Sequence, residues 1–166
     1  MTEIERSLRS AAITIELADP YSADARSCID AYFAELEELF DEGFNPMHTV
    51  SATPDELVPP AGYLLLARLD KEPVGCGALK ILGGGYAEIK RMWVSPRVRG
   101  LGVAQSLLNA LETQANEAGI DIVRLDTNRN LTKARSLYAR NGYMKIAAYN
   151  ANPYAHHWFE KRLKKT

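Results

Sequence analysis

The segment with the clearest chemical potential combines two arginines with two glycines. Residues 97–102 read Arg-Val-Arg-Gly-Leu-Gly, between a strand-like run over 87–94 and a helical pattern over 103–118. Glycines let backbone N–H groups approach an anion closely, and a helix N-terminus adds partial positive charge. The segment is therefore suited to binding a phosphate group.

This loop does not match the two common nucleotide-binding motifs. A Walker loop ends in Gly-Lys-Ser/Thr, whereas residues 102–104 are Gly-Val-Ala. A dinucleotide fingerprint needs a small residue three positions after its second glycine, where this chain has Gln105. A plain strand-to-helix turn stays open as long as the loop is considered alone.

Length and composition bound the possible functions. A chain of 166 residues predicts a single domain over 1–166, with 46% hydrophobic and 25% charged residues as in ordinary globular proteins. The net charge of -1 gives no general attraction to nucleic acid or to an anionic membrane. We expect neither kind of partner.

The two cysteines and the N-terminus bear on location. Cys28 and Cys76 have neither metal nor redox spacing, and we expect no metal site. The chain shows no apolar signal-peptide core and no apolar run of membrane-spanning length. We therefore expect a cytoplasmic protein whose cysteines are reduced and buried.

The first half of the chain predicts one strand and one long helix. We expect residues 1–10 to be frayed, because they are polar, and residues 13–17 to form a strand. A helix begins after Ser22, its N-cap, with an apolar stripe at helical spacing. A cap, a proline and acids over 53–56 indicate a second, short helix.

The rest of the chain predicts a mixed sheet. Three strands form an antiparallel meander, over 63–69, 74–82 and 87–94. The pattern then alternates between helix and strand, with helices over 103–118 and 132–140 and strands over 122–125, 143–149 and 157–163. A strand, a helix and a second strand in sequence imply one parallel pair.

Two motifs in this order resemble the GNAT superfamily of N-acetyltransferases. One is the Arg-x-x-Gly-x-Gly loop over 97–102, and the other is Leu-Tyr-Ala-Arg-Asn-Gly-Tyr over 137–143. The resemblance covers residues 60–163. It implies an α/β (α+β) fold: a mixed, mostly antiparallel sheet of about six to seven strands with a splayed parallel pair, flanked by about four helices.

The resemblance also implies acetyl-CoA as the co-substrate. Loop amides would hold its pyrophosphate, at Arg99, Gly100, Leu101, Gly102, Val103 and Ala104. The pantetheine arm would pair with backbone groups at Met92, Trp93 and Val94, as a ligand that adds to a strand edge. The Val94 N–H is the candidate to polarise the thioester carbonyl.

Transfer to an amine needs a base and an acid. A lysine-like amine with a pKa of ~10.4 loses roughly 4–5 kcal/mol on becoming neutral at pH 7. Glu88 and Asp126 are the two candidate bases, with Glu88 slightly favoured, and either could instead be an ordinary salt-bridging residue. Tyr138 matches the position of the family's usual proton donor.

The chain departs from the family pattern seven residues before this tyrosine. Many members have asparagine there, whereas this chain has Leu131, flanked by Asn130 and by Asn128 further back. Asn130 and Ser136 are therefore the polar candidates to contact the cofactor.

The acceptor cannot be named from the sequence. Five acids near the end of the first helix form an edge that could attract a cationic amine or simply be solvated, at residues 35, 37, 38, 41 and 42. His156 and His157 are adjacent, so in a strand they would face opposite sides. We expect direct transfer of acetyl to a primary amine of a small molecule or peptide, in a chain that could form a homodimer. The alternatives are a non-catalytic acyl-CoA-binding regulatory module and an enzyme that uses another short acyl-CoA.

Overall fold

A seven-stranded sheet organises the molecule. The computed structural model describes residues 1–48 and 52–164. The strands lie in the order β1-β2-β3-β4-β5-β7-β6, and every neighbouring pair is antiparallel except β4 and β5. The strands are β1 (Ile13–Ala18), β2 (Gly62–Leu69), β3 (Glu72–Gly83), β4 (Tyr86–Val94), β5 (Ile122–Thr127), β6 (Met144–Ile146) and β7 (His157–Arg162).

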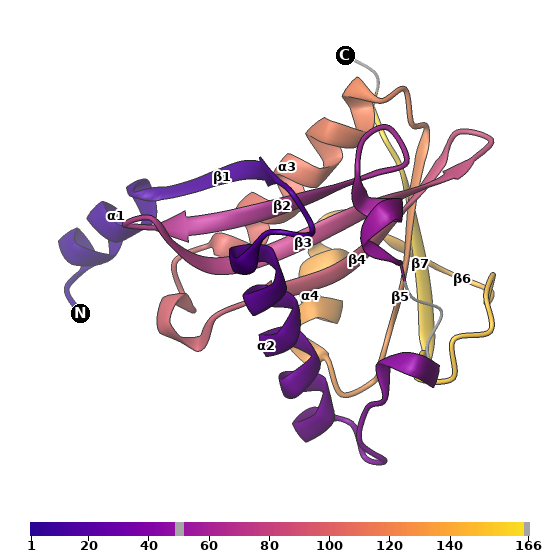
Figure 1. Cartoon of the computed structure of the whole chain (residues 1–166), viewed down its shortest axis with the longest axis horizontal. Helices are drawn as coiled ribbons and strands as arrows, with labels where there is room; N and C mark the ends of the chain where they lie inside the picture. The colour runs from indigo at the N-terminus through magenta and orange to yellow at the C-terminus, as the bar shows by residue number, and fades with distance from the viewer. Residues whose placement is uncertain (49–51, 165–166) are drawn as a thin grey trace.

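Within the described residues four α-helices accompany the sheet, so the predicted mixed fold is confirmed. The helices are α1 (Glu3–Ala11), α2 (Ala23–Leu39), α3 (Val103–Glu117) and α4 (Thr132–Arg140). Helix α2 crosses one face of the sheet, whereas α3 and α4 lie against the other (Figure 1). Strands β5 and β7 run at a steep angle to β1–β4, which opens the sheet in its middle (Figure 1).

Alternating side chains of β2 and β3 divide the core in two. Leu64, Leu66 and Cys76 pack under α2, whereas Leu65 and Leu79 pack with α3. Leu107, Leu108 and Leu111 of α3 are fully buried, and each contributes about 1.5–3 kcal/mol over an exposed leucine. The central strands, buried on both faces, give the site a rigid support.

Helix α1 corrects the expectation that residues 1–10 are frayed. Thr2 and Glu5 form a capping box, in which the Thr2 hydroxyl accepts from Glu5 N at 3.1 Å and Glu5 accepts from Thr2 N at 3.3 Å. The Ser10 hydroxyl also donates to the Leu101 carbonyl at 3.0 Å. A cap and a tether therefore hold a helix that buries no residue of its own.

The closing strand predicted over 143–149 is wrong in length. Only Met144–Ile146 pair with β7, because the chain then turns inward. Tyr149 donates to Glu88, and the Asn150 amide nitrogen donates to Asp126 at 2.7 Å. After Ile146, side-chain hydrogen bonds from Tyr149 and Asn150 hold this segment, whereas the alternating sequence predicted strand pairing.

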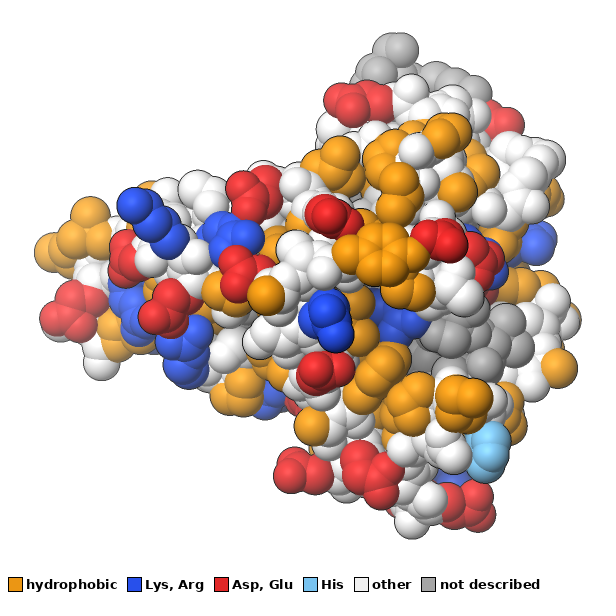
Figure 2. All heavy atoms as spheres, viewed as in Figure 1, with side chains coloured by type: hydrophobic (Ala, Val, Ile, Leu, Met, Phe, Trp, Pro, Cys, Tyr) orange, Lys and Arg blue, Asp and Glu red, His pale blue; other side chains and the backbone are white. Residues whose placement is uncertain are grey.

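The surface carries both signs of charge. Figure 2 shows acidic and basic side chains interspersed over one face, with hydrophobic side chains exposed at the end where α1 projects. Among the described residues, no helix combines the length and apolarity needed to cross a bilayer.

Candidate active site

Strands β4 and β5 separate soon after they begin. They pair only over Tyr86–Glu88 and Ile122–Arg124, although β4 continues to Val94 and β5 to Thr127. Ser95 N donates to the Val74 carbonyl at 2.7 Å, so by alternation the N–H of Val94 points to the other edge, away from β3. Beyond Glu88, β4 therefore offers backbone donors and acceptors toward the opening.

A β-bulge in β4 reshapes the edge of the opening. Cys76 pairs with Trp93 but Ala78 pairs with Lys90, so Gly77 faces both Arg91 and Met92. Arg91 has a left-handed backbone, with φ of 56°, which is uncommon for a residue other than glycine. Consequently four consecutive residues, 89–92, line one cavity, which a regular strand would not allow.

Two adjoining cavities occupy the opening. The larger, of about 680 Å³, runs from the α3 N-terminus along β4 to α4. The smaller, of about 90 Å³, lies between α2, α4 and the ends of β4 and β5. Four residues line both cavities: Tyr32, Met92, Leu131 and Ala134. A long ligand in one cavity could thus present its end to a second ligand in the other.

The loop over 97–102 forms one end of the larger cavity. Gly100 and Gly102 have left-handed φ of 84° and 75°, and a Cβ at either would meet no atom within 4 Å. Gly102 is also the N-cap of α3 and provides no side-chain cap. The first amides of α3 are thus left for an anion at a helix N-terminus.

Nine of the eleven residues predicted to contact the cofactor line the larger cavity. They are Met92, Val94, Arg99, Gly100, Gly102, Val103, Ala104, Asn130 and Ser136. The other two side chains point elsewhere: Leu101 packs in the core under α3, and Trp93 packs against the cluster under α2. Only their backbone groups remain available for the proposed contacts.

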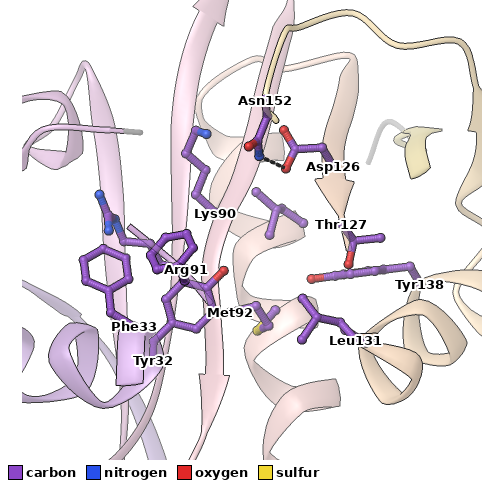
Figure 3. Close-up of a pocket in the computed structure, with 13 residues that line it drawn as sticks. Tyr32, Phe33, Lys90, Arg91, Met92, Asp126, Thr127, Leu131, Tyr138 and Asn152 are labelled. Carbon is purple, nitrogen blue, oxygen red and sulfur yellow. Dashed lines mark hydrogen bonds between the residues drawn. The ribbon is translucent and has the colours of Figure 1, made fainter. Parts of the chain in front are cut away.

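Tyr138 lies in the wall of the smaller cavity. Its side chain is 4% exposed and packs edge-on against Tyr143, with ring centroids 5.5 Å apart. Among the described residues its hydroxyl has no hydrogen-bond partner, and Figure 3 shows that hydroxyl directed into the cavity. Burial raises its pKa well above the ordinary value, so the phenol keeps its proton at neutral pH.

Asp126 also lines the smaller cavity, at the end of β5. Its carboxylate accepts from Asn150 at 2.7 Å and from Asn152 at 3.1 Å. Burial raises the pKa of Asp126, and nearby Glu88 adds to the rise, while the two asparagines and Lys90 oppose it. Figure 3 shows Asp126 and Asn152 together above the cavity.

Glu88, the other candidate base, lies outside both cavities. It is 3% exposed, and its carboxylate contacts Lys90 Nζ at 2.9 Å and accepts from the Tyr149 hydroxyl. Asn150 reaches both carboxylates, at 3.4 Å from Glu88 and 2.7 Å from Asp126. Glu88 thus belongs to a polar network behind Asp126.

Several cavity residues escaped sequence reasoning. The sequence spacing places Tyr32 in the apolar stripe of α2. In the structure, Tyr32 forms an aromatic wall of the smaller cavity together with Phe33 and Phe44. The rings of Phe33 and Phe44 lie 5.3 Å apart, and the Arg91 guanidinium lies 5.0 Å from the Phe33 centroid. The bulge that brings in Arg91 leaves no signal in a single sequence.

Much of the predicted acidic edge contacts other residues of the chain. Glu35 pairs with Arg99 at 2.6 Å, Asp41 pairs with Arg129 at 3.3 Å, and Glu37 accepts from Phe44 N at 2.7 Å. The Asn130 amide nitrogen donates to the Leu39 carbonyl at 2.8 Å, which ties the loop before α4 to the end of α2. These contacts join the two walls of the opening.

The histidine pair does not line either cavity. His156 Nδ1 accepts from Arg129 N at 3.1 Å, and His157 begins β7. Within residues 1–48 and 52–164, no cluster of three His, Cys, Asp or Glu side chains could hold a metal. Cys28 and Cys76 are buried under α2 and line neither cavity.

Comparisons with known proteins agree with this geometry. The family model described as "Acetyltransferase (GNAT) family" matches residues 27–143. The chain is 38% identical over 115 residues to an "IAA acetyltransferase" of Azospirillum brasilense, covering 69% of this chain and 67% of that one. A solved structure from Klebsiella pneumoniae, assigned to the acyl-CoA N-acyltransferases, has a TM-score of 0.75 and 31% identity, covering 93% of this chain and 99% of that one.

A more distant structure shows the same fold with a ligand. The PaiA N-acetyltransferase of Thermoplasma acidophilum, in complex with coenzyme A, has a TM-score of 0.66 at 17% identity, covering 90% of this chain and 99% of that one. Sheet order, separated β4 and β5, glycine loop and family match all point the same way. The chain belongs to the GNAT family of acetyltransferases.

Proposed function

We propose that this protein is an N-acetyltransferase that moves an acetyl group from acetyl-CoA to a primary amine while both substrates are bound. The observation that carries the proposal is one continuous opening. It runs from the uncapped N-terminus of α3, along the free edge of β4, to the hydroxyl of Tyr138 in the smaller cavity. Acetyl-CoA, when bound, supplies an acetyl group activated as a thioester.

The residues present suit an elongated anionic cofactor. Backbone amides of residues 99–104, with the left-handed glycines, would hold the pyrophosphate. The edge of β4 at residues 92–94 would pair with the amides of the pantetheine arm. The Val94 N–H, directed away from β3, would donate to the thioester carbonyl oxygen, where negative charge develops.

Asp126 is the base that the contacts favour over Glu88. The amine must lose a proton as its nitrogen attacks the carbonyl carbon, and Asp126 lines the cavity in which that amine would sit. Its raised pKa makes it a stronger base than an exposed carboxylate. Glu88 would act through Asn150, as a positioning residue behind Asp126.

Tyr138 is the acid. As the carbon–sulfur bond breaks, its hydroxyl would give a proton to the leaving sulfur. Burial raises the pKa of Tyr138, and an apolar site raises the pKa of a thiol for the same reason, because desolvation opposes both anions. Both cysteines lie away from the cavities, which supports direct transfer over a covalent acyl-enzyme step.

Acetyl-CoA consumption with a panel of amines, read as thiol release, tests the proposal. We expect turnover with at least one small primary amine and a 1:1 yield of free thiol and N-acetyl product. Calorimetry with CoA alone gives the binding constant independently of chemistry. Tight CoA binding without turnover on any amine would overturn the enzymatic proposal in favour of a regulatory module.

A further inference from the structure

Thr127 contributes a buried hydroxyl that the chain itself leaves unused. The residue is 6% exposed, and its Oγ1 has no hydrogen-bond partner among the described residues. A buried hydroxyl without a partner destabilises a protein, so such groups are rare unless a ligand or reacting group uses them. Thr127 lines the smaller cavity with Asp126 and Tyr138.

The position of this hydroxyl is fixed by the sheet. Thr127 is the last residue of β5, it pairs with His157 of β7, and its carbonyl accepts from His156 N at 3.0 Å. A β-branched side chain on such a strand has few rotamers. Figure 3 shows the hydroxyl on the side of Thr127 that faces Tyr138.

Tyr138 needs a partner of this kind during the reaction. When the phenol gives up its proton, the oxygen becomes negative in a buried place, and burial opposes that charge, as the raised pKa of Tyr138 shows. A hydroxyl that donates to this oxygen favours the ionised form. Thr127 and Tyr138 line the same cavity, and among the described residues Thr127 Oγ1 is buried without a hydrogen-bond partner. The two hydroxyls do not bond to each other in this structure, so the bond would form as the phenol ionises.

We infer that Thr127 is a positioning residue for the proton donor Tyr138: its hydroxyl donates to the phenol oxygen as Tyr138 protonates the leaving sulfur. The proton moves from Tyr138 to sulfur, and Thr127 keeps its own proton. The inference rests on the proposed function, because it gives Thr127 no role if Tyr138 is not the acid.

Two substitutions separate this role from packing. Thr127→Val keeps the shape but removes the hydroxyl, so we expect kcat to fall about 10- to 100-fold with KM values unchanged. Its Tm should rise by about 2–4 °C, because an unsatisfied buried group is gone. Thr127→Ser should keep kcat within about threefold yet lower the Tm. If Thr127 were merely structural, kcat would follow Tm in both variants.

A double-mutant cycle with Tyr138→Phe tests whether Thr127 acts through Tyr138. In the Tyr138→Phe background, Thr127→Val should cause no further loss of kcat. Thr14→Val, at an exposed threonine of β1, controls for the substitution type. Wild-type kcat in Thr127→Val, or full additivity in the cycle, overturns this inference alone. Wild-type kcat in Tyr138→Phe overturns the proposed acid, and the inference with it.

Discussion

Glu35 of α2 and Arg99 of the glycine loop form an ion pair at 2.6 Å on the rim of the larger cavity. The pair links two walls of the opening, and it engages an arginine that lies within the proposed pyrophosphate-binding loop. An anion arriving there must compete with the Glu35 carboxylate. Both side chains are partly exposed, so the pair itself contributes at most about 1 kcal/mol.

Glu35→Gln should therefore improve acetyl-CoA binding. We expect KM for acetyl-CoA to fall about two- to threefold, and Arg99→Gln to raise it about five- to tenfold. Initial rates at low and high salt measure both, and the effects should shrink as salt rises. Glu72→Gln is the matched control, since Glu72 pairs with exposed Arg97 at 2.9 Å outside both cavities. Equal changes in the two Glu→Gln variants would contradict a role for Arg99.

Gly102→Ala should weaken cofactor binding through the backbone. A Cβ there meets no neighbour within 4 Å, so the cost is conformational, about 1–2 kcal/mol for a left-handed alanine. We expect KM for acetyl-CoA to rise about tenfold. Gly83→Ala carries the same kind of strain in a hairpin, with φ of 91° and open space around it. That control should lose similar stability without a change in KM.

Tyr138→Phe should lower kcat about 100-fold or more, with CoA binding unchanged, because only the acid is removed. Packing against Tyr143 survives, since the ring is retained. Tyr143→Phe is the control: its hydroxyl donates to Glu112 at 2.8 Å, and Tyr143 lines neither cavity. It should lower stability but leave kcat within about twofold. Stopped-flow rates of thiol release measure the chemical step.

Asp126→Asn should lower kcat about 100-fold and change the pH profile. In the wild type, kcat/KM should rise with pH through the pKa of Asp126, which burial raises above its ordinary value. The asparagine variant should lose this limb. An unchanged profile would remove Asp126 from the role of base.

The same raised pKa gives a stability prediction with a definite sign. The native state holds the Asp126 proton more tightly than the unfolded chain does. This stabilisation is complete below the unfolded pKa of about 3.9 and is lost as the pH rises through the native pKa. Asp126→Asn should remove the contribution, so its unfolding free energy should fall less than that of the wild type between these pH values. Urea midpoints across acidic pH measure the difference.

Glu88→Gln should affect stability more than chemistry. Lys90 Nζ would lose its contact with the Glu88 carboxylate at 2.9 Å, and the Tyr149 hydroxyl would lose a charged acceptor, each worth about 1.5–3 kcal/mol. We expect a clear drop in the denaturation midpoint and a smaller loss of kcat in the folded fraction. A native midpoint together with a 100-fold loss of kcat would instead make Glu88 the base.

Local pattern was a good guide to the fold. Ser22 caps α2 as predicted, accepting from Ala25 N at 3.2 Å, and α4 spans the predicted residues 132–140. The alternation in the β2–β4 meander reflects side chains that point into two separate core layers. The N-terminal helix was missed because its capping box outweighs its polar composition.

The site was less predictable, because its shape depends on long-range contacts. The glycine loop and Tyr138 could be placed from motifs. The relation of Glu88 to Asp126 depends on Asn150, which the segment after β6 brings into contact with both carboxylates. Likewise, the Thr127 hydroxyl is notable because no group among the described residues forms a hydrogen bond with it. A local sequence pattern carries no information about such a missing contact.

The walls shared by the two cavities set a limit on substrate pairs. Tyr32, Met92, Leu131 and Ala134 enclose the junction where a thioester would end and an acceptor would begin. Each methylene added to the acyl chain must therefore take space from the acceptor. Butyryl-CoA should be used with the smallest amines alone, whereas acetyl-CoA should tolerate bulkier ones. The acyl length and the acceptor size that the site accepts are thus linked, because both ligands share one space at the junction.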